Sequence, residues 1–302
     1  MKVKLKILTP VHIGCNLKIS PTEYFIEGNK FIRINIESLI KNPEFKKYQV
    51  NFIEQAKNQK PINQILPNKN LLLQNKLYSI EIKIYEKFEP RQVNEFIKSA
   101  GRVYIPGSSI KGSILSGILY HFGKNKKLDN YKLKYLFEDV LNEISEYKTG
   151  KFSRWLDVSD TNMKTPEDAL NLSLVKVEGS KSRRISILYE TLKPGIEFEF
   201  ELKTSIDNFY KFGKLTENEI LKIVDEFYKK VYEKEKKYKI KEDLPSIPDK
   251  GFLIRIGQGV TLFSTSYLLL AEELKIKYHL REPSTRKLIS EKIPLGWGVI
   301  YE

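Results

Sequence analysis

The order of alternating and helical segments limits what this chain can fold into more than any other feature of its sequence. Apolar and charged residues alternate over GIEFEFELKTS (195–205). Because successive side chains of a strand point to opposite faces, this period predicts a half-buried β-strand. Three further segments show the same period or a short apolar run. The predicted core strands cover residues 1–8, 152–158, 195–204 and 252–256.

Two amphipathic helices separate these strands. Apolar residues recur at every fourth position over 109–122 and predict the first helix. Gly112 and Gly117 weaken this helix, which indicates that a packed element or a ligand approaches its backbone closely. The second helix is predicted over 216–238, where a capping box precedes an apolar stripe.

Together these segments follow the βαββαβ order of an α+β, ferredoxin-like fold, which RNA-recognition modules (RRM) also use. Insertions near 15–100, 124–150 and 160–190 are too long for simple loops and should fold over or extend from the core. We therefore expect an RRM-like core with large insertions over 1–260, and a C-terminal extension with a glycine loop over 261–302. A second ferredoxin-like unit stays an open alternative.

The first insertion contains two segments of different character. Residues 41–76 are rich in Asn, Gln, Lys and Pro, and we expect a mobile, partly helical insertion there rather than core. Residues 76–88 alternate strictly and predict another strand.

The composition favours a polyanionic partner. The 302 residues include 52 basic and 38 acidic side chains, for a net charge of +14. Such an excess is typical of nucleic-acid binding, although a lysine-rich surface without that function would give the same total. The single cysteine, Cys15, excludes an internal disulfide and a cysteine zinc site. A chain with one cysteine suits a reducing compartment, so we expect a cytoplasmic protein. No apolar run reaches the ~20 residues of a membrane span, so we expect no membrane partner.

The first candidate site is the turn before the first helix. Pro106-Gly107-Ser108-Ser109 is followed by Lys111, with no acidic residue nearby in the sequence. Backbone N–H groups at a helix start, two hydroxyl groups and a lysine would form a phosphate cradle. An ordinary serine N-cap after a Pro-Gly turn is the alternative.

Two further clusters could extend this site. RIGQG (255–259) contains Arg255 and two glycines, Gly257 and Gly259, that would let the backbone approach a ligand. KVEGSKSRRIS (176–186) is a basic loop. Its basic residues near the centre are Lys181, Arg183 and Arg184. If all three clusters lie on one face, they form a groove that follows an RNA backbone.

Catalysis has weaker support in the sequence. Metal-free RNA cleavage needs a general base near neutrality and a cationic stabiliser, which His12 with Lys111 could supply. A lone histidine is more often a packing or RNA-contact residue, so we expect no catalytic residue. Asp157 and Asp160 could hold Mg²⁺, but aspartates beside a turn are more often caps. We expect no metal and no cofactor.

Five short segments, taken in order along the chain, resemble the RAMP superfamily of CRISPR proteins. They are TPVHIG (9–14), SPTEY (20–24), EFIKSAGRVYIPGSSIKGSI (95–114), LDVSD (156–160) and YETLKPGIEFEF (189–200). Within the superfamily, these segments are most similar to the fifth-subunit group of the type III-A Csm effector complex.

This resemblance implies a non-catalytic RNA-binding subunit with an RRM-like fold that acts in antiviral defence. Such subunits cap the 3′-proximal end of the guide crRNA and stack on the repeated backbone subunit of the Csm complex. They also aid maturation of the guide's 3′ end, and the resemblance leaves open whether a host nuclease is a further partner. By position, the resemblance places the family's Pro-Gly-Ser-Ser-x-Lys-Gly element on residues 106–112. It also makes His12 and Gly14 of the His-Ile-Gly loop expected RNA contacts.

One departure and two alternative subfamilies remain. Many relatives have an arginine soon after the Lys-Gly pair, where this chain has Leu115 and then Ser116-Gly117, so we do not expect the guide contact of that arginine here. The alternatives are the repeated backbone subunit, which would cleave target RNA with an aspartate on an insertion, and a metal-independent endoribonuclease that processes CRISPR repeat RNA. The second would need a histidine-based site such as His12 with Lys111.

Overall fold

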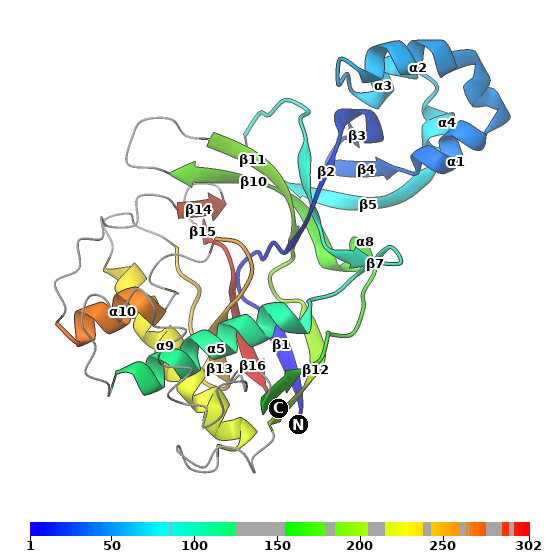
Figure 1. Ribbon diagram of the computed structural model, residues 1–302. Coiled ribbons are helices and arrows are strands. Elements are labelled where there is room, and N and C mark those ends of the chain that lie inside the picture. The colour runs from blue at the N-terminus through cyan, green and yellow to red at the C-terminus, as the bar shows by residue number, and fades with distance from the viewer. Residues whose placement is uncertain are drawn as a thin grey trace, which may run out of the picture.

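The chain folds around two β-sheets, with the larger helices packed beside one sheet and a group of short helices at the far end of the other (Figure 1). The fold is therefore α+β, as expected. The computed structural model describes residues 1–84, 86–124, 155–178, 185–204, 215–237, 243–259, 264, 266–275, 286–289 and 293–302.

The first sheet has five strands in the order β13-β16-β1-β12-β9, and every neighbouring pair is antiparallel. These strands are β1 (Lys2–Ile7), β9 (Leu156–Val158), β12 (Glu197–Thr204), β13 (Phe252–Arg255) and β16 (Trp297–Tyr301). All four predicted core strands are present. The first, third and second of them lie side by side as β1, β12 and β9, which is the arrangement that a ferredoxin-like βαββαβ order requires.

The fourth core position was predicted wrongly. The βαββαβ order would put its last strand, residues 252–256, beside the first strand. Instead β16 from the C-terminal segment lies there, and β13 pairs with the outer side of β16. Burial alone does not distinguish the two strands, because Leu253 and Ile254 of β13 are as buried as Trp297 and Ile300 of β16. The edge strand β13 is protected, since the Leu253 N–H donates to Asp225 Oδ1 at 2.9 Å.

Helices α5 (Gly107–Gly123) and α9 (Glu217–Lys236) pack against each other and against this sheet (Figure 1). Both predicted helices are confirmed, as is the capping box at the start of α9. One helix glycine has the expected packing role, because a Cβ added at Gly117 would lie only 3.0 Å from Val224 Cα of α9. At Gly112 nothing lies within 4 Å, so packing does not account for that glycine.

The outward side chains of β1 and β12 form a ladder of opposite charges. Three lysines of β1 each lie opposite a glutamate of β12. The pairs are Lys2 with Glu201, Lys4 with Glu199 and Lys6 with Glu197. Because the charges balance across the two strands, this face has little attraction for a polyanion.

The second sheet consists mainly of the expected insertions. Its main path runs β2-β6-β11-β10-β5-β4-β3. β14 pairs with β10, and β15 pairs with β14. The sheet includes parallel pairs between β5 and β10 and between β6 and β11. Its strands are β2 (Gly14–Ile19), β3 (Tyr24–Glu27), β4 (Lys30–Ile34), β5 (Lys76–Lys83), β6 (Val93–Phe96), β10 (Leu170–Glu178), β11 (Ile185–Leu192), β14 (Arg286–Ile289) and β15 (Ile293–Pro294). The strand order of this second sheet, with its parallel pairs, differs from the all-antiparallel order of the first sheet, so the second sheet does not repeat the arrangement of the first.

The segment between β4 and β5 folds into short helices with a core of their own. They are α1 (Ile36–Lys41), η2 (Pro43–Tyr48), α2 (Gln49–Ala56), α3 (Ile62–Ile65) and α4 (Lys69–Gln74). The helical content expected over 41–76 is confirmed, but the expectation that this segment contributes no core is wrong, because several of its apolar side chains are buried against one another and against β3 and β4. The segment also contributes to a separate buried cluster of Phe25, Ile32, Ile34, Leu39, Phe45, Ile62, Ile65, Leu66, Leu71 and Leu72.

The remaining described elements are small or lie near α5. They are η1 (Pro21–Glu23), β7 (Lys98–Ser99), β8 (Arg102–Val103), α8 (Pro166–Ala169) and α10 (Ser266–Glu273). Over the described ranges, no helix has both the length and the apolar character needed to cross a bilayer.

Candidate nucleic-acid interface

The 255–259 cluster meets the loop of His12 and Gly14 through the backbone, and α5 contacts the same cluster through a side chain. The Gln258 N–H donates to the His12 carbonyl oxygen at 2.8 Å, which ties the 255–259 loop to the loop that contains Gly14. Ser113 Oγ of α5 donates to the Arg255 carbonyl oxygen at 2.7 Å. The third cluster, with Lys181, Arg183 and Arg184, lies outside the described residues.

The glycines of these loops serve close packing between the loops. Gly257 has a φ of +76°, and a Cβ there would lie 2.5 Å from the His12 carbonyl oxygen. A Cβ at Gly14 would lie 3.0 Å from His12 Nε2, and one at Gly259 would lie 2.7 Å from Leu295 Cβ. The glycines therefore let the two loops touch, and the contact defines the surface that they present together.

His12 lies beneath this surface, with 1% of its area exposed. Its Nδ1 lies 2.7 Å from the Glu190 carbonyl oxygen, and its ring packs edge-on against Tyr189 with centroids 4.5 Å apart. An edge contact to Phe96 completes this packing. In this conformation the imidazole supports the loop from behind, so it does not present the general base that the catalytic alternative requires.

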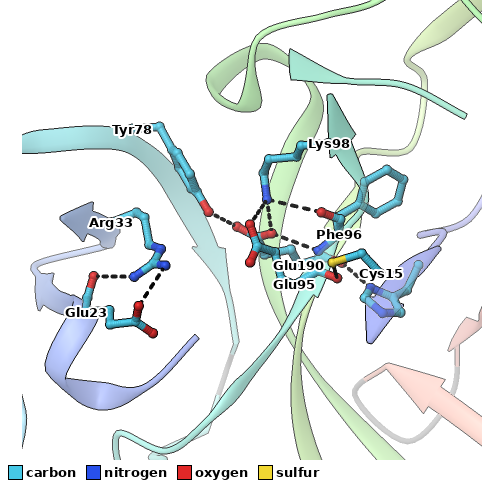
Figure 2. Close-up of polar contacts among 9 residues, drawn as sticks. Cys15, Glu23, Arg33, Tyr78, Glu95, Phe96, Lys98 and Glu190 are labelled. Carbon is cyan, nitrogen blue, oxygen red and sulfur yellow. Dashed lines mark hydrogen bonds and ion pairs between the residues drawn. The ribbon is translucent and has the colours of Figure 1, made fainter. Parts of the chain in front are cut away.

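A buried charged network centred on Glu190 holds the strands behind His12 together (Figure 2). The Glu190 carboxylate is fully buried and accepts hydrogen bonds from Tyr78 Oη at 2.6 Å, Lys98 Nζ at 2.6 Å and the Phe96 N–H at 2.9 Å. Lys98 also pairs with Glu95 at 3.2 Å. Because a buried carboxylate is costly unless all its acceptors are used, this set of donors is what allows Glu190 to be there.

The network also affects Tyr78. Burial, and then the neighbouring Glu190 charge, raise the pKa of the Tyr78 hydroxyl well above its ordinary value, so the hydroxyl stays a donor. The sequence analysis did not identify Glu190 or Lys98. No alternation marked Glu190 in the sequence, because Leu188 to Leu192 are all buried, on both faces of β11.

Arg255 is not on the surface where we expected it to bind RNA. Its guanidinium is 1% exposed and pairs with the fully buried Glu235, while Nε donates to the Leu295 carbonyl oxygen at 3.0 Å. Nη2 donates to the Gly259 carbonyl oxygen at 3.0 Å, and the group lies 5.1 Å from the Trp297 ring centroid. The physical reason is that a buried carboxylate and two carbonyls satisfy the cation inside the protein, where it supports the 257–259 loop.

The start of α5 differs from both sequence interpretations. Pro106 is the N-cap and makes no side-chain bond, so neither serine acts as the cap. The Gly107 N–H instead donates to Asp160 Oδ1 at 2.8 Å, and a Cβ at Gly107 would lie 2.2 Å from the Val158 carbonyl oxygen. Asp160 thus caps α5, which was expected in preference to a role in binding Mg²⁺. Its negative charge complements the dipole at the N-terminus of the helix.

The rest of the α5 turn stays accessible. Ser108 is exposed, and Ser109 and Lys111 are partly exposed. A phosphate group approaching this turn would meet these side chains, but it would also meet the Asp160 carboxylate at the first N–H of the helix. The expected cradle is therefore a surface of side chains beside a capped helix.

Comparison with known proteins supports a family assignment. The family model of the RAMP superfamily matches residues 4–261. This chain belongs to the RAMP superfamily. The resemblance found in the sequence motifs is confirmed, and the superfamily implies a ferredoxin-like core such as the first sheet contains.

Among individual relatives, this RAMP protein is similar to Csm5 proteins of CRISPR systems. It is 28% identical to Csm5 of Methanocaldococcus jannaschii over 184 residues, which cover 53% of this chain and 42% of that protein. It is 26% identical to Csm5 of Streptococcus thermophilus over 266 residues, which cover 76% of this chain and 69% of that protein. The first match thus spans less than half of the curated relative.

Two solved structures share the fold over nearly their whole length. A chain of the cryo-EM structure of a Csm–crRNA–target RNA ternary complex of a type III-A CRISPR-Cas system superposes with a TM-score of 0.76 at 22% identity, covering 100% of both chains. The crystal structure of T. onnurineus Csm5 superposes with a TM-score of 0.73 at 20% identity, covering 98% of this chain and 99% of that one.

Proposed function

We propose that this RAMP protein is an RNA-binding, Csm5-like subunit of a type III-A Csm effector complex. It caps the 3′-proximal end of the guide crRNA and aids maturation of that end in antiviral defence in the cytoplasm. The observation that carries the proposal is the full-length likeness to a chain of a Csm–crRNA–target RNA complex, joined to the sequence similarity to Csm5. Its partners are the crRNA, the other Csm subunits, above all the repeated backbone subunit, and a host nuclease that trims the guide.

The proposed RNA surface lies where the two glycine loops meet the start of α5. Lys111 supplies a cation, Ser108 and Ser109 supply hydroxyl groups, and the backbones at Gly14 and Gly257 supply the adjoining surface. Gly107 and Gly259 shape this surface through packing, and His12 and Arg255 support it from below. The basic residues Lys181, Arg183 and Arg184 extend it in the part of the sequence outside the described residues.

The open face of the first sheet is a poorer candidate. RNA-recognition modules bind with aromatic side chains on that face. Here the outward positions of β1 and β12 hold the balanced lysine–glutamate ladder, which offers neither a stacking platform nor an excess of positive charge.

We also propose that the subunit supplies no catalytic group. The burial of His12 and its use of Nδ1 toward the Glu190 carbonyl support a structural role for this residue. In the described part of the chain, no group of three histidine, cysteine or acidic side chains could hold a metal ion. The endoribonuclease alternative would need the His12 loop to open and bring the imidazole to RNA together with Lys111.

A salt titration tests the RNA surface directly. The full chain is titrated with a labelled single-stranded crRNA at several salt concentrations, and the RNA is then run on a denaturing gel. Lys111→Gln should weaken binding and reduce the log–log salt slope by about 0.7, the value for one phosphate contact on a single strand. The matched control is Lys4→Gln on the charge ladder, which should leave the slope unchanged.

Three results would contradict the proposal in different ways. An unchanged slope for Lys111→Gln would remove the α5 turn from the interface. A reduced slope for Lys4→Gln would move the interface to the sheet face. Discrete cleavage of the RNA that disappears in His12→Ala would replace the non-catalytic subunit by the endoribonuclease.

A further inference from the structure

Strand β3 lies at the end of the second sheet away from α5 and α9 (Figure 1). A groove is lined by residues of β3, by its turn to β4 and by neighbouring segments. Its volume is about 1110 Å³. β3 is the last strand on its side of the sheet and pairs only with β4 among the described strands. The groove therefore lies beside a strand edge that no other described strand covers.

The hairpin register shows which backbone groups face this groove. A two-residue turn, Gly28-Asn29, joins β3 to β4, so Glu27 and Lys30 form the hydrogen-bonded pair that closes the hairpin. Hydrogen-bonded and non-hydrogen-bonded pairs alternate along an antiparallel ladder. The N–H and C=O groups of Tyr24 and Ile26 consequently point away from β4, toward the groove, while those of Phe25 bond to β4.

The walls of the groove are built from two separate segments. Asn63 and Gln64 of α3 line one side, and residues 86–91 line the other. The second wall is held in place by Tyr24, whose Oη donates to the Arg91 carbonyl oxygen at 2.8 Å and accepts from the Arg91 N–H at 3.0 Å. Both walls therefore flank the open strand edge.

The lining is apolar at the base and neutral at the rim. Ile26, Ile82, Ile84 and Phe88 supply the apolar surface, and amides of α3 stand at the rim. The charged rim residues balance, and they are Glu86, Lys87, Glu89 and Arg91. In a chain with a net charge of +14, this balance makes the groove a weak site for RNA and a suitable site for an uncharged polypeptide.

We propose that this groove binds an extended segment of a neighbouring protein subunit, which adds to β3 as a further strand. Main-chain bonds to Tyr24 and Ile26 hold the segment, and apolar side chains at its alternate positions enter the base of the groove. At about 3.3 Å per residue, the four residues of β3 (Tyr24–Glu27) pair with about four residues of the partner. The proposal rests on the proposed function, since it takes the partner from the Csm assembly.

Photo-cross-linking identifies the occupant. The photoreactive amino acid p-benzoylphenylalanine replaces Gln64 in the full chain, which is assembled with the other Csm subunits and crRNA, irradiated and analysed by mass spectrometry. Asn58, exposed in the same helical segment and outside the groove lining, is the matched control position. Cross-links from position 64, and none from position 58, should fall in one short segment of one Csm subunit. Cross-links to RNA, or none at all, would overturn the proposal.

Blocking the groove gives a second, independent measurement. Gln64→Trp should lower incorporation into the assembly at least roughly tenfold in competition with the wild-type chain, about 1.4 kcal/mol, whereas Asn58→Trp should not. Equal melting temperatures of Gln64→Trp, Asn58→Trp and the wild-type chain would exclude a folding defect as the cause. Equal incorporation of both variants would overturn the proposal.

Hydrogen exchange distinguishes strand addition from docking by side chains alone. On assembly, the amides of Tyr24 and Ile26 should exchange at least roughly tenfold more slowly, while that of Phe25 should change little. Unchanged exchange at Tyr24 and Ile26 would overturn strand addition.

The RNA titration of the isolated chain separates this test from the proposed function. If Gln64→Trp lowers RNA affinity, the groove binds RNA and this proposal fails while the proposed function stands. If the wild-type chain joins no Csm assembly, the proposed function fails, and this proposal fails with it.

Discussion

Oppositely charged pairs occur in two regions of this protein that differ sharply in burial. Behind the glycine loops, Arg255–Glu235 and Lys98–Glu190 are withdrawn almost completely from solvent. On the open face of the first sheet, lysines and glutamates of β1 and β12 form a ladder in water, with Lys4 and Glu199 3.9 Å apart. The same side-chain chemistry therefore has two uses, because burial sets what a broken pair costs.

The difference also affects how the net charge should be interpreted. Arg255 counts toward the +14 of the chain, but its charge is used inside the protein to hold the 257–259 loop. The ladder lysines are exposed, but each lies opposite a glutamate of β12. Under the proposed function, RNA would be bound by surface cations without a matching acid, and Lys111 is the candidate among the described residues.

The largest expected effect comes from removing the acid of a buried pair. Glu235→Ala should lower the free energy of unfolding by about 3–5 kcal/mol, because it leaves the Arg255 cation buried without its carboxylate. Urea unfolding measures this loss. The double variant Glu235→Ala/Arg255→Met should recover much of it, and equal losses in the single and double variants would show that the charge is not the cause.

A smaller loss of unfolding free energy is expected when a substitution at Glu190 keeps most hydrogen bonds of its buried network. Glu190→Gln retains an acceptor for Tyr78 but removes the charge opposite Lys98, so we expect about 1–3 kcal/mol in urea unfolding. The matched control is Glu95→Gln, on the more exposed side of the same lysine, which should cost less. If both variants lose the same amount, burial does not distinguish the two carboxylates.

An effect at alkaline pH is expected from Tyr24, which holds the groove wall. Burial raises the pKa of Tyr24 to about 12 from its ordinary 10.0. The unfolded chain therefore loses this proton first, and stability should fall as the pH rises from about 10 toward 12. Melting temperatures of the wild-type chain and Tyr24→Phe measure the effect, and the variant should show a shallower decline. A parallel decline in both would assign it to other groups, and Tyr104→Phe serves as the control.

The smallest effect is expected on the ladder. Lys4→Gln should change the free energy of unfolding by less than about 0.5 kcal/mol, because exposed pairs are screened and contribute little. A loss comparable to that of Glu190→Gln would mean that the exposed ladder contributes as much as a buried pair, and the comparison between the two regions would fail.

Much of the first sheet and its helices was predictable from periodicity. The strand over 195–204 is β12, and the helices over 109–122 and 216–238 are α5 and α9 with ends shifted by one or two residues. These elements have one buried face, so the alternation or helical stripe is visible along the sequence. The family motifs were equally local, and the superfamily assignment that they indicated is confirmed.

The candidate site was only partly predictable. The sequence marked the 255–259 loop and the α5 start as parts of one site on the condition that they lie on one face, and Ser113 of α5 does contact the Arg255 carbonyl oxygen. The contact of that loop with His12 was not predicted. The sequence did not indicate that Asp160 would cap α5, that Arg255 would face Glu235, or that Glu190 would join three strands. Each of these contacts links residues at least 20 positions apart, so no local pattern records it.

The sequence by itself determined the helices, the main strands, the superfamily and the excess of positive charge, because these depend on local spacing and on composition. Only the tertiary structure decided that β16 pairs with β1, which charges are buried and which strand edge stays open. Those outcomes depend on which segments bury one another, and burial sets both the cost of a charge and the availability of a backbone hydrogen bond.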